Sequence, residues 1–205
     1  MKMITCLLLF SSVSLLAAAP APCCLESKPV KTDSCCEALA AAPFSKTSIY
    51  QADANFVTDT GAPFKLSNLR NQLVVLTMFY ASCSYACPLT VADMQTIRGK
   101  LPPELRQRIA FVLVSFDVAR DTPEILAKYR EQRGLDSSWT LLRGNDDSIC
   151  ELAALIGVKF KPETDGTFSH SNLVTILNAQ GEIVHQRLGL QGGLDEAAAA
   201  LTGLK

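Results

Sequence analysis

The sequence lacks an excess of basic residues and contains only two histidines. Its 19 lysines and arginines are balanced by 20 aspartates and glutamates, which gives a formal net charge of −1 over 205 residues. Because nucleic-acid binding needs clustered lysine and arginine to neutralise phosphates, this balance argues against a nucleic-acid partner. Apolar residues make up 48% of the chain, which suffices for the core of one domain with extensions.

Charge is also absent from residues 4–19 (ITCLLLFSSVSLLAAA), which follow a positive start at Lys2. This layout predicts a signal peptide in residues 1–19 and export to a bacterial periplasm. An uncleaved anchor that tethers the protein to the inner membrane is the alternative, although the stretch is shorter than the ~20 apolar residues of a spanning helix. A lipoprotein with Cys23 as the lipidated residue fits less well, because Pro20 and Pro22 replace the usual apolar and small residues.

Residues 20–48 show no apolar periodicity and are dominated by Pro, Ala, Ser and Lys, which predicts a flexible tether. The tether contains two adjacent pairs, Cys23-Cys24 and Cys35-Cys36. Neighbouring cysteines rarely bridge each other, because the small ring strains the peptide. Two interpretations remain open: disulfides between the pairs or loose thiols in an oxidising compartment, and a soft-metal clamp for Cu(I) or zinc.

Residues 49–205 have the pattern of an α/β domain with a central mixed sheet flanked by helices. Two continuous apolar runs, 73–80 (LVVLTMFY) and 109–116 (IAFVLVSF), are typical of strands buried on both faces of a parallel sheet. The other expected elements are an N-terminal hairpin turning at Gly61, helices over 88–100, 121–133, 148–156 and 194–201, a strand at 139–142, and a terminal hairpin of 172–177 with 182–186.

Cys83 and Cys87 lie between the first buried strand and a helix expected to start at Pro88. A thiol at a helix N-terminus feels the positive end of the backbone dipoles, which favours the thiolate that binds metals or attacks disulfides. The Cys-x-x-x-Cys spacing predicts two sulfurs about one helical turn apart on one face, so that both can point at one ion.

Three ordered segments carry a family resemblance over about residues 49–192: 79–88 (FYASCSYACP), 115–124 (SFDVARDTPE), and His170-Ser171 before a late strand and 178–181 (NAQG). They resemble the SCO/SenC family of copper chaperones for cytochrome c oxidase assembly. The resemblance implies a thioredoxin-like fold and one copper ion, Cu(I) or Cu(II), held by Cys83, Cys87 and His170. It also implies a thiol reductant that keeps the cysteines reduced, and delivery to the binuclear copper site of the oxidase second subunit or to another copper-accepting protein. The protein would then be a metallochaperone and not an enzyme.

Two thiolates and one imidazole form a small, soft ligand set suited to copper, whereas structural zinc normally takes a fourth protein ligand. Two positions depart from the family pattern: Ser169 stands where an aspartate usually precedes the histidine, and Val118 replaces a proline. The missing charge at position 169 removes no ligand. The other histidine, His185, is expected to be exposed and structural.

The main alternative is a thiol–disulfide oxidoreductase that uses Cys83 and Cys87 to reduce a partner. Thioredoxin-like reductases generally place a cis proline before the late strand, opposite the thiols, but residues 168–172 (FSHSN) contain none. This difference favours metal binding. A peroxidase is disfavoured because the loop before Cys83 lacks the Pro-x-x-x-Thr pattern of peroxiredoxins. Cys150 is expected to be a buried, inert thiol on the helix 148–156.

Overall fold

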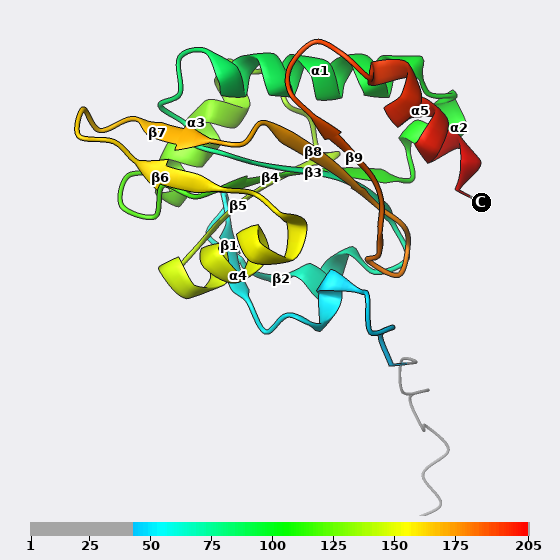
Figure 1. Ribbon diagram of the computed structural model, residues 1–205, viewed down its shortest axis with the longest axis horizontal. Coiled ribbons are helices and arrows are strands. Elements are labelled where there is room, and N and C mark those ends of the chain that lie inside the picture. Colours follow the sequence, from blue (N-terminus) through cyan, green and yellow to red (C-terminus); the bar gives the residue numbers. More distant parts are fainter. Residues whose placement is uncertain (1–42, 205) are drawn as a thin grey trace, which may run out of the picture. The chain divides into compact units, whose positions relative to one another are not determined.

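A seven-stranded mixed sheet organises the computed structural model, which describes residues 43–204 (Figure 1). The segment 1–19 and the four cysteines of the tether lie outside the described residues. Within those residues, no helix is both long and apolar enough to cross a membrane. The strand order is β2-β1-β5-β4-β3-β8-β9, made of β1 (Asn55–Thr58), β2 (Pro63–Lys65), β3 (Leu73–Phe79), β4 (Ile109–Ser115), β5 (Trp139–Gly144), β8 (Leu173–Leu177) and β9 (Ile183–Leu188).

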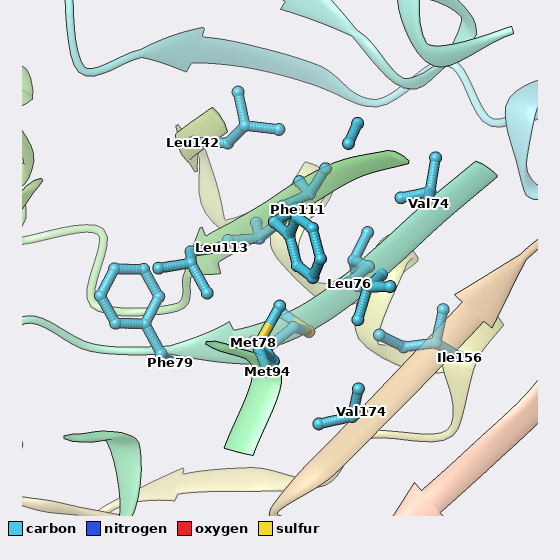
Figure 2. Packing of buried hydrophobic residues seen from close by; sticks show 14 of the residues in the cluster. Val74, Leu76, Met78, Phe79, Met94, Phe111, Leu113, Leu142, Ile156 and Val174 are labelled. Carbon is cyan, nitrogen blue, oxygen red and sulfur yellow. The ribbon is translucent and has the colours of Figure 1, made fainter. Parts of the chain in front are cut away.

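The two apolar runs form the adjacent central strands β3 and β4, which pair in parallel from Leu73 opposite Ile109 to Phe79 opposite Ser115. All seven residues of each strand are buried, as expected where both faces of a sheet are covered. Figure 2 shows side chains of β3, β4, β8, α1 and α4 in this core. The burial of these two strands determines where β3 ends, and therefore where the cysteine loop begins.

Helices cover both faces of the sheet: α1 (Ala86–Lys100), α3 (Pro123–Gln132), α4 (Asp146–Ile156) and α5 (Leu194–Gly203), with a short α2 (Pro103–Arg106). The helices α1 and α3 cross between successive parallel strands in the same direction, so right-handed crossovers place both on one face. Figure 1 shows α1, α3 and α5 above the sheet and α4 below it. Single 3₁₀ turns lie at Ile49–Gln51 and Leu66–Leu69.

The expected mixed sheet, N-terminal hairpin and terminal hairpin are all present. Several predicted boundaries shift by two residues. The helix α1 begins at Ala86 and not at Pro88, α4 begins at Asp146 and not at Ser148, α5 ends at Gly203 and not at Leu201, and the strand predicted over 139–142 continues to Gly144. Residues 43–48, assigned to the tether from the sequence, contact the domain through hydrogen bonds from the Ser45 and Thr47 hydroxyls to Glu182.

A separate two-stranded sheet was not expected from the sequence. It consists of β6 (Phe160–Pro162) and β7 (Phe168–His170), paired antiparallel with Phe160 opposite His170. An Asp165-Gly166 turn joins the strands, and Gly166 has a φ of 81°. An Asp-Gly pair between short segments that carry aromatic residues is a known hairpin signal, so the sequence did contain evidence for this element.

Candidate metal centre

The Cys83 sulfur occupies the position of a cap at the start of α1. The N-cap residue, Tyr85, makes no side-chain capping hydrogen bond. Instead, the backbone N–H of Cys87, in the first helical turn, donates to Sγ of Cys83 at 3.3 Å. The first N–H groups of a helix lack partners within the helix, so a thiolate here satisfies a donor and meets the positive end of the helix dipole.

Only one of the two cysteines belongs to the helix, which corrects the expected geometry. Cys87 lies in the first turn of α1, whereas Cys83 lies in the preceding loop. The sulfurs meet because that loop folds back in a turn, closed by a hydrogen bond from the Cys83 N–H to the Tyr80 carbonyl oxygen at 3.2 Å. The two sulfurs still lie close enough to bind one ion, as expected, although the local geometry differs.

His170 is the last residue of β7 and reaches the cysteines from the other side. Three residues later, at Leu173, the chain enters β8, which pairs antiparallel with β3 and so begins near the end of β3 where the cysteine loop starts. The ring Nδ1 lies 3.2 Å from the Ser171 carbonyl oxygen. Because a carbonyl only accepts, Nδ1 carries the proton and Nε2 keeps its lone pair. That Nε2 lies 3.8 Å from Sγ of Cys87.

The three residues offer one ligand atom each, and these atoms all lie within 4.8 Å of one another. Metal–sulfur and metal–nitrogen bonds of roughly 2.0–2.3 Å hold trigonal ligands about 4 Å apart, so the set closes around one ion with small movements. Cys83 and Cys87 are buried and His170 is half-buried. Within residues 43–204, this is the only such group of three histidine, cysteine or acidic side chains.

The two thiols have opposite acidities. A hydrogen bond from the Cys87 thiol, with further ones from the backbone N–H groups of Cys87 and Tyr85, lowers the pKa of Cys83 to about 4 despite its burial. The same thiol–thiolate bond, together with burial, raises the pKa of Cys87. The reduced protein therefore carries one thiolate, on Cys83, stabilised by the proton that Cys87 retains. A soft metal ion that displaces this proton gains a second thiolate.

Aromatic rings form one wall of the site. The ring centroid of His170 lies 5.9 Å from that of Tyr80, in an edge-on arrangement, and 5.3 Å from that of Phe116. The ring of Phe168, two residues before His170 on the same strand, has its centroid 5.2 Å from those of Tyr80 and Phe116. These contacts attach the small β6–β7 sheet to the domain and orient the imidazole.

Segment 115–121 contacts both sides of the site. The family resemblance includes this segment but did not assign it a structural role. On the cysteine side, the buried carboxylate of Asp121 accepts from the Ala81 N–H at 2.8 Å and from the Ser115 hydroxyl. On the histidine side, the buried carboxylate of Asp117 pairs with Arg120, whose guanidinium lies 5.7 Å from the centroid of the Phe168 ring. One short segment thus supports both the cysteine loop and the histidine strand.

The remaining cysteine and histidine of the described chain do not join the site. The prediction that Cys150 is buried was wrong, because this residue is exposed. The inward face of α4 is made by Ile149, Leu152, Ala153 and Ile156, and Cys150 lies one position off that face. His185 is half-buried on the edge strand β9, where exposure was expected.

Among the described residues there is no cis peptide bond, and Ser171 and Asn172 lead into β8. The cis proline that thioredoxin-like reductases generally place opposite their thiols is therefore replaced here by a chain that presents an imidazole. At this place His170 brings an imidazole beside the two thiols.

Comparison with known proteins identifies the family of this chain. The family described as SCO1/SenC matches residues 44–204, which is most of the chain. The chain belongs to the SCO1/SenC family. A relative from Stutzerimonas stutzeri, named as a candidate copper-binding protein, is 30% identical over 131 residues, 62% of this chain and 63% of its own. The matched regions span between 42% and 63% of the lengths of the three curated relatives.

Solved structures of SCO1/SenC proteins share the fold. A Bacillus anthracis lipoprotein of the family superposes with a TM-score of 0.66 at 21% identity, covering 73% of this chain and 91% of its own. Yeast Sco1 with copper bound superposes with a TM-score of 0.63 at 20% identity, covering 74% and 88%. The family resemblance and the thioredoxin-like α/β fold expected from the sequence are thus confirmed.

Proposed function

We propose that this SCO1/SenC protein binds one copper ion through Cys83, Cys87 and His170 and passes it to a copper-accepting protein. The convergence of two thiol sulfurs and one imidazole nitrogen within 4.8 Å carries the proposal. This ligand set is soft, matches the preference of Cu(I), and leaves room for an added ligand that Cu(II) would need. Copper is bound in the solved structure of yeast Sco1, which has the same fold.

Transfer follows from the number of ligands. A site with three protein ligands can admit one more. An incoming thiolate can therefore bind copper before Cys83, Cys87 or His170 dissociates from it. No bond of the target is made or broken apart from those to the metal, which fits a chaperone rather than an enzyme. The expected recipient is the binuclear copper site of the second subunit of cytochrome c oxidase, as the family resemblance implies.

The full chain, by the same proposal, consists of an export segment at 1–19, a cysteine-containing tether at 20–48 and the copper-binding domain at 49–205. Export to the periplasm, free or anchored at the inner membrane, agrees with the charge-free stretch 4–19. A Bacillus anthracis member of the family is described as a lipoprotein, so membrane attachment occurs within the family.

The test is a Cu(I) titration of the reduced chain against a competing chelator, with the four tether cysteines changed to serine. We expect one equivalent to bind, and His170→Ala to lower the affinity by at least about 100-fold, since a ligand contributes more than the 10–100-fold typical of its outer partners. His185→Ala is the matched control and leaves the affinity unchanged. Equal affinities for the two histidine variants would refute the proposal.

The same titration with the tether cysteines restored tests the clamp hypothesis for Cys23, Cys24, Cys35 and Cys36. A soft-metal clamp predicts a second equivalent of bound copper. Binding that stays at one equivalent contradicts the clamp and leaves disulfides or loose thiols as the interpretation of these pairs.

One observation favours a second activity at the same site. The thiolate of Cys83 lies beside the protonated Cys87, the arrangement used for thiol–disulfide exchange. Cys83 would attack a target disulfide, Cys87 would then attack the mixed disulfide, and a thiol reductant would restore the dithiol. This reduction needs both cysteines but not the imidazole. A His170→Ala variant that reduces an oxidised dithiol peptide at the wild-type rate, but binds copper poorly, separates the two activities.

A further inference from the structure

Tyr80 contacts both sides of the candidate metal centre. It directly follows β3, and its carbonyl oxygen accepts the hydrogen bond from the Cys83 N–H that closes the cysteine turn, at 3.2 Å. Its ring lies edge-on to the His170 ring, with the two centroids 5.9 Å apart. Tyr80 is only 5% exposed, so its hydroxyl needs hydrogen-bond partners within the protein.

The hydroxyl of Tyr80 has one partner on the histidine strand. The N–H of Phe168, in β7, donates to this oxygen at 3.5 Å. The ladder bonds of the β6–β7 hairpin fall at every second residue, as in the bond from the Glu163 N–H to the Thr167 carbonyl oxygen. Phe168 is the residue after Thr167, so its N–H points away from β6. The contact with Tyr80 is therefore a polar link between the open edge of β7 and the end of β3.

The same hydroxyl also meets the Cys83 sulfur. Burial raises the pKa of Tyr80, the hydrogen bond from the Phe168 backbone opposes this rise, and the charge of the Cys83 thiolate and a hydrogen bond to its sulfur add to it. The phenol therefore keeps its proton. Because the Phe168 N–H can only donate, this proton remains for the sulfur of Cys83. The hydroxyl thus accepts from one side of the site and donates to the other.

A second buried tyrosine provides a contrast. Tyr129, on α3, is 3% exposed and its ring packs against Phe79. Within residues 43–204, the hydroxyl of Tyr129 has no hydrogen-bond partner. Packing in the core accounts for both rings, but it does not account for the two hydrogen bonds of the Tyr80 hydroxyl.

We propose that Tyr80 is a positioning residue whose hydroxyl joins the two sides of the site, holding the β6–β7 hairpin against the end of β3 and donating a hydrogen bond to Cys83. The inference rests on the proposed copper function and deepens it by assigning the contact that controls when His170 leaves the ion. While the link is made, the imidazole stays within reach of both sulfurs. When the link breaks, the hairpin can open and an incoming thiolate can replace His170. The same bond restrains the nucleophilicity of Cys83 in the metal-free protein.

The test compares Tyr80→Phe with Tyr129→Phe in the full chain, with the four tether cysteines changed to serine. Each variant removes one buried hydroxyl and keeps the ring. In the reduced, copper-free protein, we expect the Phe168 amide hydrogen to exchange at least about fivefold faster in Tyr80→Phe, because this N–H loses its acceptor. Tyr129→Phe should leave the exchange rate at its wild-type value. Amide exchange followed by NMR measures both, and equal rates in the two variants overturn the link to β7.

Alkylation with iodoacetamide at pH 8, where Cys83 is a thiolate, tests the bond to its sulfur. A thiolate that loses a hydrogen-bond donor becomes more basic and therefore more nucleophilic. Cys83 should then react at least about twofold faster in Tyr80→Phe than in Tyr129→Phe. Fragment-level mass spectrometry assigns the reaction to Cys83. A role of Tyr80 in packing alone leaves this rate unchanged, and an unchanged rate contradicts the bond.

Copper release connects the link with the proposed function. Loaded with Cu(I), Tyr80→Phe should release the ion to excess chelator at least about twofold faster than Tyr129→Phe, because the hairpin opens more often. Equal release rates, with the amide exchange raised, contradict control of release by Tyr80. The exchange and alkylation measurements need no metal. They therefore decide the Tyr80 link even if the chain binds no copper, so failure of the link and failure of the copper function are distinguishable.

Discussion

The two sides of the candidate metal centre are built very differently. The cysteine side follows β3, a seven-residue strand that is wholly buried in the middle of the main sheet. The histidine side ends β7, a three-residue strand whose pairing partner is the equally short β6, with no fully buried residue in either strand. The thiols are thus part of the core, and the imidazole is attached to its edge.

Side-chain packing compensates for the weak backbone support of the histidine side. The rings of Tyr80 and Phe116 contact His170, Phe168 packs against both of those rings, and Arg120 lies over Phe168. Elements with few buried contacts open at low free energy, so we expect motion in this site to concentrate in the β6–β7 hairpin.

The largest expected effect tests the cysteine side. Phe79, the last residue of β3, is fully buried and lies 5.0 Å from the Tyr129 ring, measured between centroids. Phe79→Ala should lower the free energy of unfolding by about 3–5 kcal/mol, the usual cost of emptying a large core site. Urea denaturation measures the loss, and a cost below about 1 kcal/mol would mean that the end of β3 is not held by the core.

A smaller effect, of another kind, is expected on the histidine side. Phe168 is half-buried and contacts the rings that enclose His170. Phe168→Ala should weaken Cu(I) binding by about 10–100-fold, as loss of outer support does at metal sites. Global unfolding should change by less than about 1.5 kcal/mol. Phe168→Leu, which keeps apolar bulk, is the control. An affinity unaffected by Phe168→Ala would show that the rings do not position the imidazole.

The smallest change is expected in the pH profile of Cys83. The hydrogen bonds that lower its pKa to about 4 keep it as thiolate at neutral pH, and protonation follows only as the pH falls through that value. Alkylation of Cys83 should therefore slow by less than about twofold between pH 8 and pH 6. In the urea-unfolded chain, with a thiol pKa near 8.5, the rate should fall roughly 80-fold.

Fragment-level mass spectrometry separates Cys83 from Cys87 in this measurement. If the alkylation rate of Cys83 in the folded protein falls with pH as steeply as in the unfolded chain, Cys83 is not a thiolate at neutral pH. The flat profile is also expected to depend on Cys87, whose thiol donates to Cys83; in Cys87→Ala the rate should respond more strongly to pH.

Much of this architecture was predictable because the relevant signals are local. The runs 73–80 and 109–116 are too apolar to be anything but buried strands, and a cysteine pair after such a strand and before a helix falls at the sheet edge. The start of α1 was misjudged by two residues because Pro88 is favoured in the first turn without having to be the first residue. Cys150 was misassigned because one position along a helix turns a side chain by about 100°.

The sequence alone determined the family and the α/β class, since each depends on residue identity and order, and it singled out Cys83, Cys87 and His170 as candidate ligands. Tertiary structure alone decided that the Cys83 sulfur caps α1 and that segment 115–121 supports both sides of the site. The physical reason is distance along the chain. Cys87 and His170 are 83 residues apart in the chain and are brought together by the pairing of β8 with β3, which no local pattern encodes.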